Sequence, residues 1–331
     1  MKERILSTGS TLLPAVAYGD AAGLPAETMS AQKIKDEYGS INRLVTPTNN
    51  PFYENAPIGS WSDDTQLSLA IARALIKNSG FDISAIAQEH IEELQRTPLV
   101  QVGKGEPVPR GWGHSTAESI QKLLVGINPD KSGKKDGAGN GIVMKMSPLA
   151  LWHIGQNIPD EQRWQEYDQL TTMTHDSDTA RVCSRVHGDV LKYLFEQGDE
   201  GLAEYIQESV MFHENEFTTT KDTSKSLAFL AKIQSFDQTT ILEHTDGKGF
   251  WVPQTLAMAY ATYLEYAPDF HKTVFAAVNL GGDTDSNASI VATMIAFRSH
   301  GVDLPSDIYQ LHDLANLERI SSQLARAAVR L

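Results

Sequence analysis

The sequence predicts an all-α protein that folds as one compact domain. Apolar residues recur at helical spacing in several segments, whereas the alternating patterns that form strands and hairpins are scarce. No linker separates stretches of different composition, so residues 1–331 are expected to form a single domain. The composition, 41% hydrophobic and 21% charged, is typical of a globular protein and excludes the disordered and fibrous classes.

These patterns predict the following helices. The first begins near Asp64, where apolar residues start to recur at helical spacing, and Ser62 or Asp63 can cap it. Residues 288–297 are apolar on nearly all sides, which indicates a helix buried in the core. Further helices are expected at residues 117–125, from about 142, at 179–194, at 255–267 and around 317–324.

Charge and cysteine content limit the partners. The chain has 28 basic and 42 acidic residues, a net charge of −14, and this field repels an extended polyanion such as nucleic acid. A bound metal could still reverse the local sign and admit a small phosphorylated ligand. The single cysteine, Cys183, cannot form an internal disulfide. The longest apolar runs are shorter than the roughly 20 residues that a membrane span needs.

The N-terminus only weakly resembles a secretion signal. Basic residues precede the apolar run 12–17, but Glu3, a polar stretch at 7–11 and Pro14 interrupt it. We therefore expect a cytoplasmic protein without a membrane partner.

Two long loops are rich in Pro, Gly, Asn and Asp, at residues 46–58 and 128–141, and such loops often carry function. The second ends in the Gly-rich run 137–141, whose backbone N–H groups could hold a pyrophosphate at the start of the next helix. From these residues alone an ordinary surface turn is the more common explanation.

Three short segments concentrate carboxylates, at residues 19–27, 60–65 and 281–286, and the last two come directly before apolar helices. Helix capping is the ordinary explanation, but one cap needs only one side-chain acceptor. It does not explain why Asp63 adjoins a second aspartate, or why Asp283 lies two residues before another.

A divalent cation is the alternative explanation for these carboxylates. Carboxylates at the starts of buried helices repel each other and resist desolvation, and a cation offsets both penalties. Hard oxygen ligands without Cys favour Mg²⁺, Mn²⁺ or Ca²⁺ over zinc, and Ser62 and Ser286 add hydroxyl oxygens. Four aspartates could bridge two ions about 3.5–4 Å apart. From the residues alone, a metal site and capping with solvated charge both stay open.

Several other side chains have ordinary structural explanations. Ser115 is a plausible cap of the helix that follows it, and His114 is expected to be a polar loop residue, since no Ser or Cys nucleophile is paired with it. Cys183 is expected to be a small buried residue rather than a nucleophile. Trp251 and the tyrosines of 260–266 are expected in the core.

Four motifs occur in a fixed order after the GDAAG…E segment: SWSDDT at 60–65, GAGNGIVMKMSP at 137–148, THDSD at 174–178 and NLGGDTDS at 279–286. Together they resemble the ADP-ribosylglycohydrolase family, which includes the dinitrogenase-reductase-activating glycohydrolases. The resemblance runs from about residue 9 to residue 299. It implies an orthogonal helical bundle with two Mg²⁺ (or Mn²⁺) ions that hydrolyses the bond between ADP-ribose and an acceptor.

Matching positions in these motifs imply the site residues. The metal ligands that the resemblance implies are Ser62, Asp63, Asp64, Asp283, Asp285 and Ser286. Among these, Asp64 and Asp283 are expected to be catalytic together with Glu27, which falls on the family's glutamate near the metals and acts on water or as a gate. The residues that these motifs imply to bind the substrate are Gly139, Asn140, Gly141 and His175. The resemblance also places the loop 111–116 (GWGHST) beside the distal ribose and phosphate, which adds Gly113, His114 and Ser115.

This chain departs from the family pattern at three positions. Ser62 and Ser286 stand where members often carry Thr, which retains the hydroxyl oxygen. Lys145 stands where members usually carry Arg, which keeps the charge but loses the bidentate fork. If that position supports the site electrostatically, affinity or substrate preference is expected to differ.

The function expected from sequence is a binuclear metal-dependent hydrolase that removes ADP-ribose from a modified acceptor, with protein arginine as the first candidate. Serine, an O-acetyl group and a nucleic-acid base stay open as acceptors. Two alternatives stay open for the function: a non-catalytic ADP-ribose-binding or crystallin-like member, and a metal phosphohydrolase that attacks the pyrophosphate. The expected partner is an ADP-ribosylated protein or another ADP-ribose conjugate.

Overall fold

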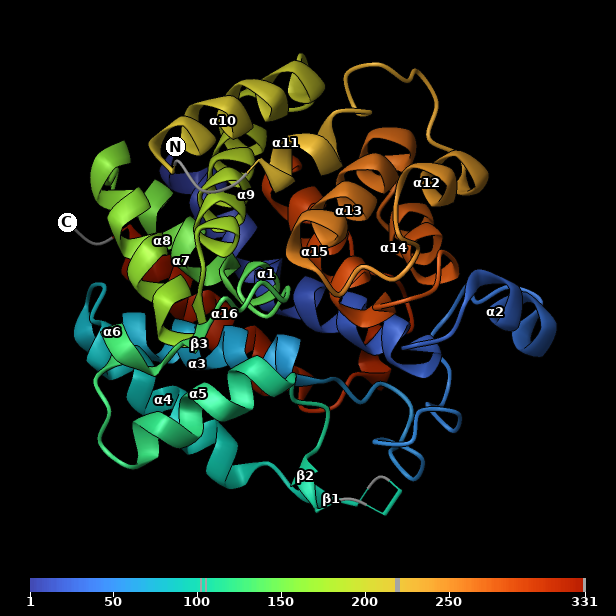
Figure 1. Cartoon of the computed structure of the whole chain (residues 1–331), viewed down its shortest axis with the longest axis horizontal. Helices are drawn as coiled ribbons and strands as arrows, with labels where there is room; N and C mark the ends of the chain where they lie inside the picture. Colours follow the sequence, from blue (N-terminus) through green and yellow to red (C-terminus); the bar gives the residue numbers. More distant parts are fainter. Residues whose placement is uncertain (102, 105, 218–220, 330–331) are drawn as a thin grey trace.

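A computed structural model describes residues 1–101, 103–104, 106–217 and 221–329, and helices dominate it (Figure 1). The α-helices are α1 (Lys2–Gly23), α2 (Ala31–Tyr38), α3 (Asp63–Asn78), α4 (Ile83–Arg96), α5 (His114–Leu124), α6 (Pro129–Ser132), α7 (Ser147–Gly155), α8 (Asp160–Thr174), α9 (Asp178–Gln197), α10 (Leu202–Glu216), α11 (Asp222–Leu227), α12 (Gln238–His244), α13 (Val252–Tyr266), α14 (Phe270–Asn279), α15 (Thr284–Arg298) and α16 (Leu314–Ala328).

Short elements join these helices. The 3₁₀ turns are η1 (Leu24–Ala26), η2 (Val143–Lys145) and η3 (Ile308–Gln310). The strands, each of two residues, are β1 (Leu99–Val100), β2 (Val108–Pro109), β3 (Lys134–Lys135) and β4 (His175–Asp176). β1 pairs antiparallel with β2, and β3 pairs parallel with β4. The all-α fold class is confirmed.

The core is built around α1 and its long contact with α15. α1 lies in the middle of the molecule, where it packs against α15 and α16 (Figure 1). All residues of α15 except Arg298 are buried, as the all-round apolar pattern of 288–297 predicts. A Cβ atom on Gly23 would lie 2.3 Å from the backbone of Thr284, so only glycine permits this close approach. The contact brings the end of α1 beside the start of α15.

α3 completes the frame around the site. It packs against α1, α4, α7 and α16, while α13 and α14 contact α15 from another side. Ser62 caps α3 by accepting from the backbone N–H of Asp64, as expected. The acidic starts of α3 and α15 therefore meet beside the end of α1, although more than 200 residues separate them in sequence.

Several local expectations are confirmed. The helices expected at 179–194, 255–267, 288–297 and 317–324 lie in α9, α13, α15 and α16. Cys183 is buried in α9, and burial raises the pKa of its thiol to about 12. The apolar run 12–17 is buried within α1. Across the described ranges, no helix is long and apolar enough to span a membrane.

Three local expectations are wrong. α5 begins at His114, three residues earlier than expected, and Gly113 occupies the cap position that was assigned to Ser115. The helix expected from about 142 begins at Ser147, where Pro148 favours a first turn, because η2 intervenes. Trp251 is 37% exposed rather than in the core, since it stands outside the first turn of α13.

Candidate functional site

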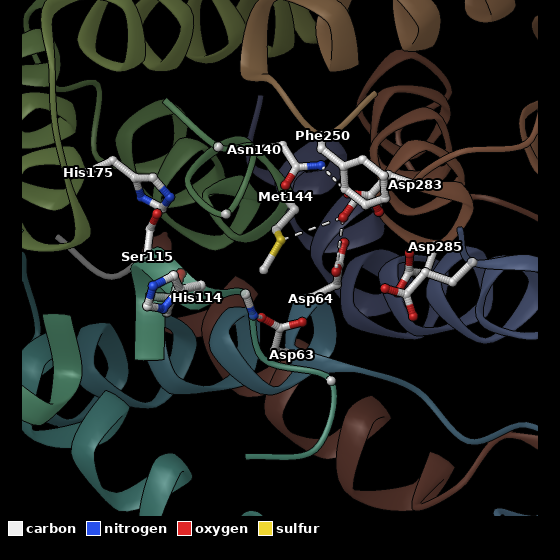
Figure 2. Close-up of a pocket in the computed structure, with 17 residues that line it drawn as sticks. Asp63, Asp64, His114, Ser115, Asn140, Met144, His175, Phe250, Asp283 and Asp285 are labelled. Carbon is white, nitrogen blue, oxygen red and sulfur yellow. Dashed lines mark hydrogen bonds between the residues drawn. The ribbon is translucent and has the colours of Figure 1, made fainter. Parts of the chain in front are cut away.

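The expected site residues converge on one pocket of about 220 Å³ (Figure 2). Thirteen of them line it: Glu27, Asp63, Asp64, Gly113, His114, Ser115, Gly139, Asn140, Gly141, His175, Asp283, Asp285 and Ser286. Ser62 lies behind them and contacts Asp64. In Figure 2 the aspartates of α3 and α15 occupy one side of the pocket, and His114, Ser115 and His175 occupy the other.

Asp64 joins the two acidic segments. Its Oδ2 accepts hydrogen bonds from the hydroxyls of Ser62 at 3.2 Å and Ser286 at 3.3 Å. Its Oδ1 is buried and has no hydrogen-bond partner among the described residues. Such an oxygen is costly to bury unless a cation or a proton compensates it.

The start of α15 is held from several directions. Gly282 adopts a left-handed φ of +77°, which lets its N–H reach Met29 O at 2.7 Å, and the N–H of Asp283 reaches Lys248 O at 2.7 Å. Asn140 of the Gly-rich loop donates to Asp283 Oδ2 at 2.7 Å. Asp285 Oδ1, like Asp64 Oδ1, is buried and unpartnered in the described part of the chain.

Burial and mutual repulsion raise the pKa values of these carboxyls. Burial and then the charge of Asp285 raise the pKa of Asp63 to about 7 and the pKa values of Glu27 and Asp283 well above their usual range. For Asp64 burial is again the largest cause, followed by Asp20 and Asp285. Ionising all these carboxyls together is therefore costly unless positive charge lies among them.

Hard divalent cations fit this set of donors. The carboxylates and the two serine hydroxyls are the oxygen ligands that Mg²⁺ and Mn²⁺ prefer, and two buried carboxylate oxygens lack a partner. Within the described residues, no three His, Cys, Asp or Glu side chains already surround one point closely enough to hold an ion.

Asp20 was noticed as part of an acidic segment but was not predicted as a site residue. It is fully buried near the end of α1, and its two oxygens accept from the N–H of Ser62 at 2.8 and 2.9 Å. Its Oδ2 also accepts from the N–H of Thr65 at 3.1 Å and from its hydroxyl at 2.5 Å. Asp20 thus positions the first turn of α3. The sequence offered one signal for Asp20: it is a single acidic residue among the small residues at the end of α1.

Two further residues were missed by the sequence analysis. Asn50, in the 46–58 loop, donates to Glu27 Oε2 at 2.8 Å and to Leu24 O at 3.0 Å, so it orients Glu27. Phe250 lines the pocket and is 42% exposed. Its carbonyl accepts from the N–H of Asn140 at 3.1 Å. Neither residue lies in a recognisable motif. Each acts through contacts with segments that are distant in sequence, so the sequence alone did not identify it.

The start of α5 faces the carboxylates across the pocket. The N–H of Gly113 donates to Asp63 Oδ2 at 3.3 Å. No side chain in the described ranges caps α5, so the first-turn N–H groups of His114, Ser115 and Thr116 stay available at the positive end of the helix. Ser115 was expected to cap this helix. Because it does not, the start of α5 can receive an anion.

Comparison of the sequence with known proteins identifies the family that this chain resembles. A family model described as ADP-ribosylglycohydrolase matches residues 8–330. The ADP-ribosyl-[dinitrogen reductase] glycohydrolase of Rhodospirillum rubrum is 24% identical over 294 residues, which cover 88% of this chain and 85% of that protein. The ADP-ribosylarginine hydrolase Tri1 of Pseudomonas putida is 23% identical over 307 residues, 91% of this chain and 72% of that protein.

A solved structure shares the fold. A chain described as an ADP-ribosylglycohydrolase-related protein complex superimposes with a TM-score of 0.72 at 21% sequence identity. The superposition covers 99% of this chain and 100% of that chain.

Proposed function

Because the chain belongs to the ADP-ribosylglycohydrolase family, we propose that it hydrolyses the bond between ADP-ribose and a modified acceptor, with the acidic pocket as its active site. The observation that carries this proposal is the convergence of the family motifs on one pocket. There the buried carboxylates at the starts of α3 and α15 face the Gly-rich loop and the uncapped start of α5.

The pocket is proposed to take two Mg²⁺ or Mn²⁺ ions, held by Ser62, Asp63, Asp64, Asp283, Asp285 and Ser286. The unpartnered Oδ1 atoms of Asp64 and Asp285 and the mutual repulsion of the carboxyls support this. When bound, such ions act as Lewis acids that lower the pKa of a nearby water. Their positive charge also neutralises the acidic surface. A neutralised surface also answers why a chain of charge −14 would bind a phosphorylated ligand.

The other polar groups have separate tasks in this scheme. Cleavage at the anomeric carbon of the ribose builds positive charge on the sugar, which the pocket's carboxylates stabilise. Glu27, held through Oε2 by Asn50, keeps Oε1 for proton transfer to or from water. The backbone of Gly139, Asn140 and Gly141 and the start of α5 offer N–H groups to the pyrophosphate.

Protein-bound arginine is the acceptor that we propose first. The support is the similarity to a protein named as an ADP-ribosylarginine hydrolase. No cysteine lines the pocket, and among the described residues no hydrogen bond joins a pocket serine to a histidine, so hydrolysis by an activated water is the mechanism that the side chains support.

The test is release of ADP-ribose from arginine- and serine-ADP-ribosylated proteins with Mg²⁺, Mn²⁺ or EDTA. We expect metal-dependent release of intact ADP-ribose from the arginine conjugate. Asp283→Ala should lower turnover at least about 100-fold, whereas Asp303→Ala, an exposed aspartate outside the pocket, should match the wild type. AMP as product would identify a phosphohydrolase instead. Tight ADP-ribose binding without release from either conjugate would identify a binding protein.

A further inference from the structure

Behind the Gly-rich loop, a buried lysine is linked to a pocket histidine through one hydroxyl group. Lys145 in η2 is 0% exposed, and its Nζ donates to Thr174 Oγ1 at 3.3 Å. The same Oγ1 lies 2.9 Å from His175 Nδ1. Thr174 ends α8 and His175 begins β4. We call these three side chains the lysine relay.

The chemistry of the three groups sets the direction of the hydrogen bonds. An ammonium group has no acceptor, so Lys145 donates to Thr174. Burial lowers the pKa of Lys145 to about 7, and the nearby Asp63 carboxyl works against this fall, so the group is an ammonium below that pH. Thr174 Oγ1 thereby accepts one hydrogen bond, and its own proton can be donated to His175 Nδ1, the other partner that the described residues give it. Nδ1 is then an acceptor, and a neutral imidazole carries its proton on Nε2.

His175 stays neutral in this environment. The ring is 2% exposed, and burial together with the charge of Lys145 lowers its pKa to about 3. The ring is therefore not a general acid near neutral pH. It has one N–H group to offer.

The Nε2 end of the ring lies against backbone without side chains. A Cβ atom on Gly141 would lie 3.4 Å from Nε2, and one on Gly139 would lie 3.5 Å from it. Both glycines and His175 line the pocket, and Figure 2 shows the ring on the same side as Ser115. Nε2 has no hydrogen-bond partner within the described part of the chain. Its N–H group is therefore available to a ligand beside the Gly-rich loop.

We propose that the lysine relay locks His175 in the Nε2–H tautomer, so that Nε2 donates a hydrogen bond to an oxygen atom of the ADP-ribose held against Gly139 and Gly141. Lys145 and Thr174 are positioning residues that act through the ring. The identity of the ligand rests on the proposed function, whereas the tautomer does not.

The tautomer can be measured directly by ¹⁵N–¹H NMR of histidine-labelled protein near pH 6. The lysine is then charged, because burial lowers its pKa only to about 7. His175→Gln identifies the signal by its loss. We expect a proton on Nε2 and none on Nδ1. Thr174→Val and Lys145→Met should each release the preference for Nε2–H, while Thr174→Ser and Lys145→Arg should retain it.

Two results would overturn the relay. One is a proton on Nδ1 in the wild type, and the other is an unchanged tautomer in both Thr174→Val and Lys145→Met. An unaltered signal of the buried His187, whose pKa is lowered by burial alone, shows that each variant is folded.

Titration with ADP-ribose tests the ligand contact separately. The Nε2–H signal should shift on binding, and Thr174→Val should bind about tenfold more weakly, while Thr174→Ser stays within about twofold. Binding without any response of the Nε2–H signal would overturn the contact. If the wild type binds no ADP-ribose, the proposed function and the contact both fail, whereas the tautomer measurement still decides the relay.

Discussion

Asp20 makes the start of α3 sensitive to one side chain outside the expected ligand set. Asp20→Ala removes the acceptor of two buried backbone N–H groups, those of Ser62 and Thr65, and of the Thr65 hydroxyl. Each unsatisfied buried donor costs about 1–3 kcal/mol. The substitution also removes the desolvation cost of a buried carboxylate, which offsets part of this loss of stability. We therefore expect the free energy of unfolding to fall by about 2–4 kcal/mol, a large share of an ordinary domain's stability.

Asp20→Asn should be milder, because the amide oxygen can still accept from Ser62. The Thr65 N–H and hydroxyl both lose Oδ2 as an acceptor, but the hydroxyl can instead accept from the new amide N–H. We expect a loss of about 1–2 kcal/mol. Thr65→Val is the matched control, since it removes the hydroxyl hydrogen bond and leaves both backbone contacts in place. It should cost about 1 kcal/mol.

The assay for this series is urea unfolding, with calorimetric titration of Mn²⁺ as a second measurement. The midpoint should fall without a change in slope if stability alone changes. Because Asp20 positions Ser62 and the two aspartates that follow, Mn²⁺ affinity should fall about 10- to 100-fold in Asp20→Ala. The reasoning is refuted if Asp20→Ala matches the wild type within about 0.5 kcal/mol and binds Mn²⁺ equally well.

Two further predictions follow from the buried titratable groups. Burial and Asp285 raise the pKa of Asp20 to about 8, and that of Asp63 rises to about 7. The folded state therefore holds protons that the unfolded state releases, and the metal-free protein should lose stability as pH rises from about 5 to 8, by more than about 5 °C in Tm. Saturating Mg²⁺ should flatten this slope, and an equally steep slope with Mg²⁺ would contradict the account. Cys183→Ser should retain activity, since the thiol is buried and its pKa is raised to about 12; a folded but inactive variant would contradict a mechanism without a thiol.

The sequence predicted those parts of the fold that depend on local pattern. The all-round apolar run in 288–297 identifies a core helix because burial on every side leaves no polar face. Helix starts were harder to predict: α5 begins at His114 because Gly113 supplies the extended backbone of a cap, and no side chain signals it. Trp251 was expected in the core, yet it occupies the N-cap position of α13 and is 37% exposed.

Most of the pocket's lining could be predicted because those residues occur in short motifs, although Phe250, which lies outside them, was missed. The groups that support the lining could not, since each acts across a long stretch of chain. Asp20 reaches Ser62 across 42 positions, and Asn50 reaches Glu27 across 23. Lys145 was noticed for its departure from the family pattern, but its contact with Thr174 joins two residues that lie 29 positions apart. These long-range contacts can be identified only from the assembled structure.

A crystal structure of the protein with Mn²⁺ and ADP-ribose tests the central claim most directly. The account predicts two anomalous peaks in the acidic pocket, between the Asp63–Asp64 pair and the carboxylates of Asp283 and Asp285. It also predicts that the pyrophosphate lies against Gly139 to Gly141 and the start of α5. ADP-ribose bound elsewhere on the molecule, or in this pocket with no manganese beside these aspartates, would contradict the account.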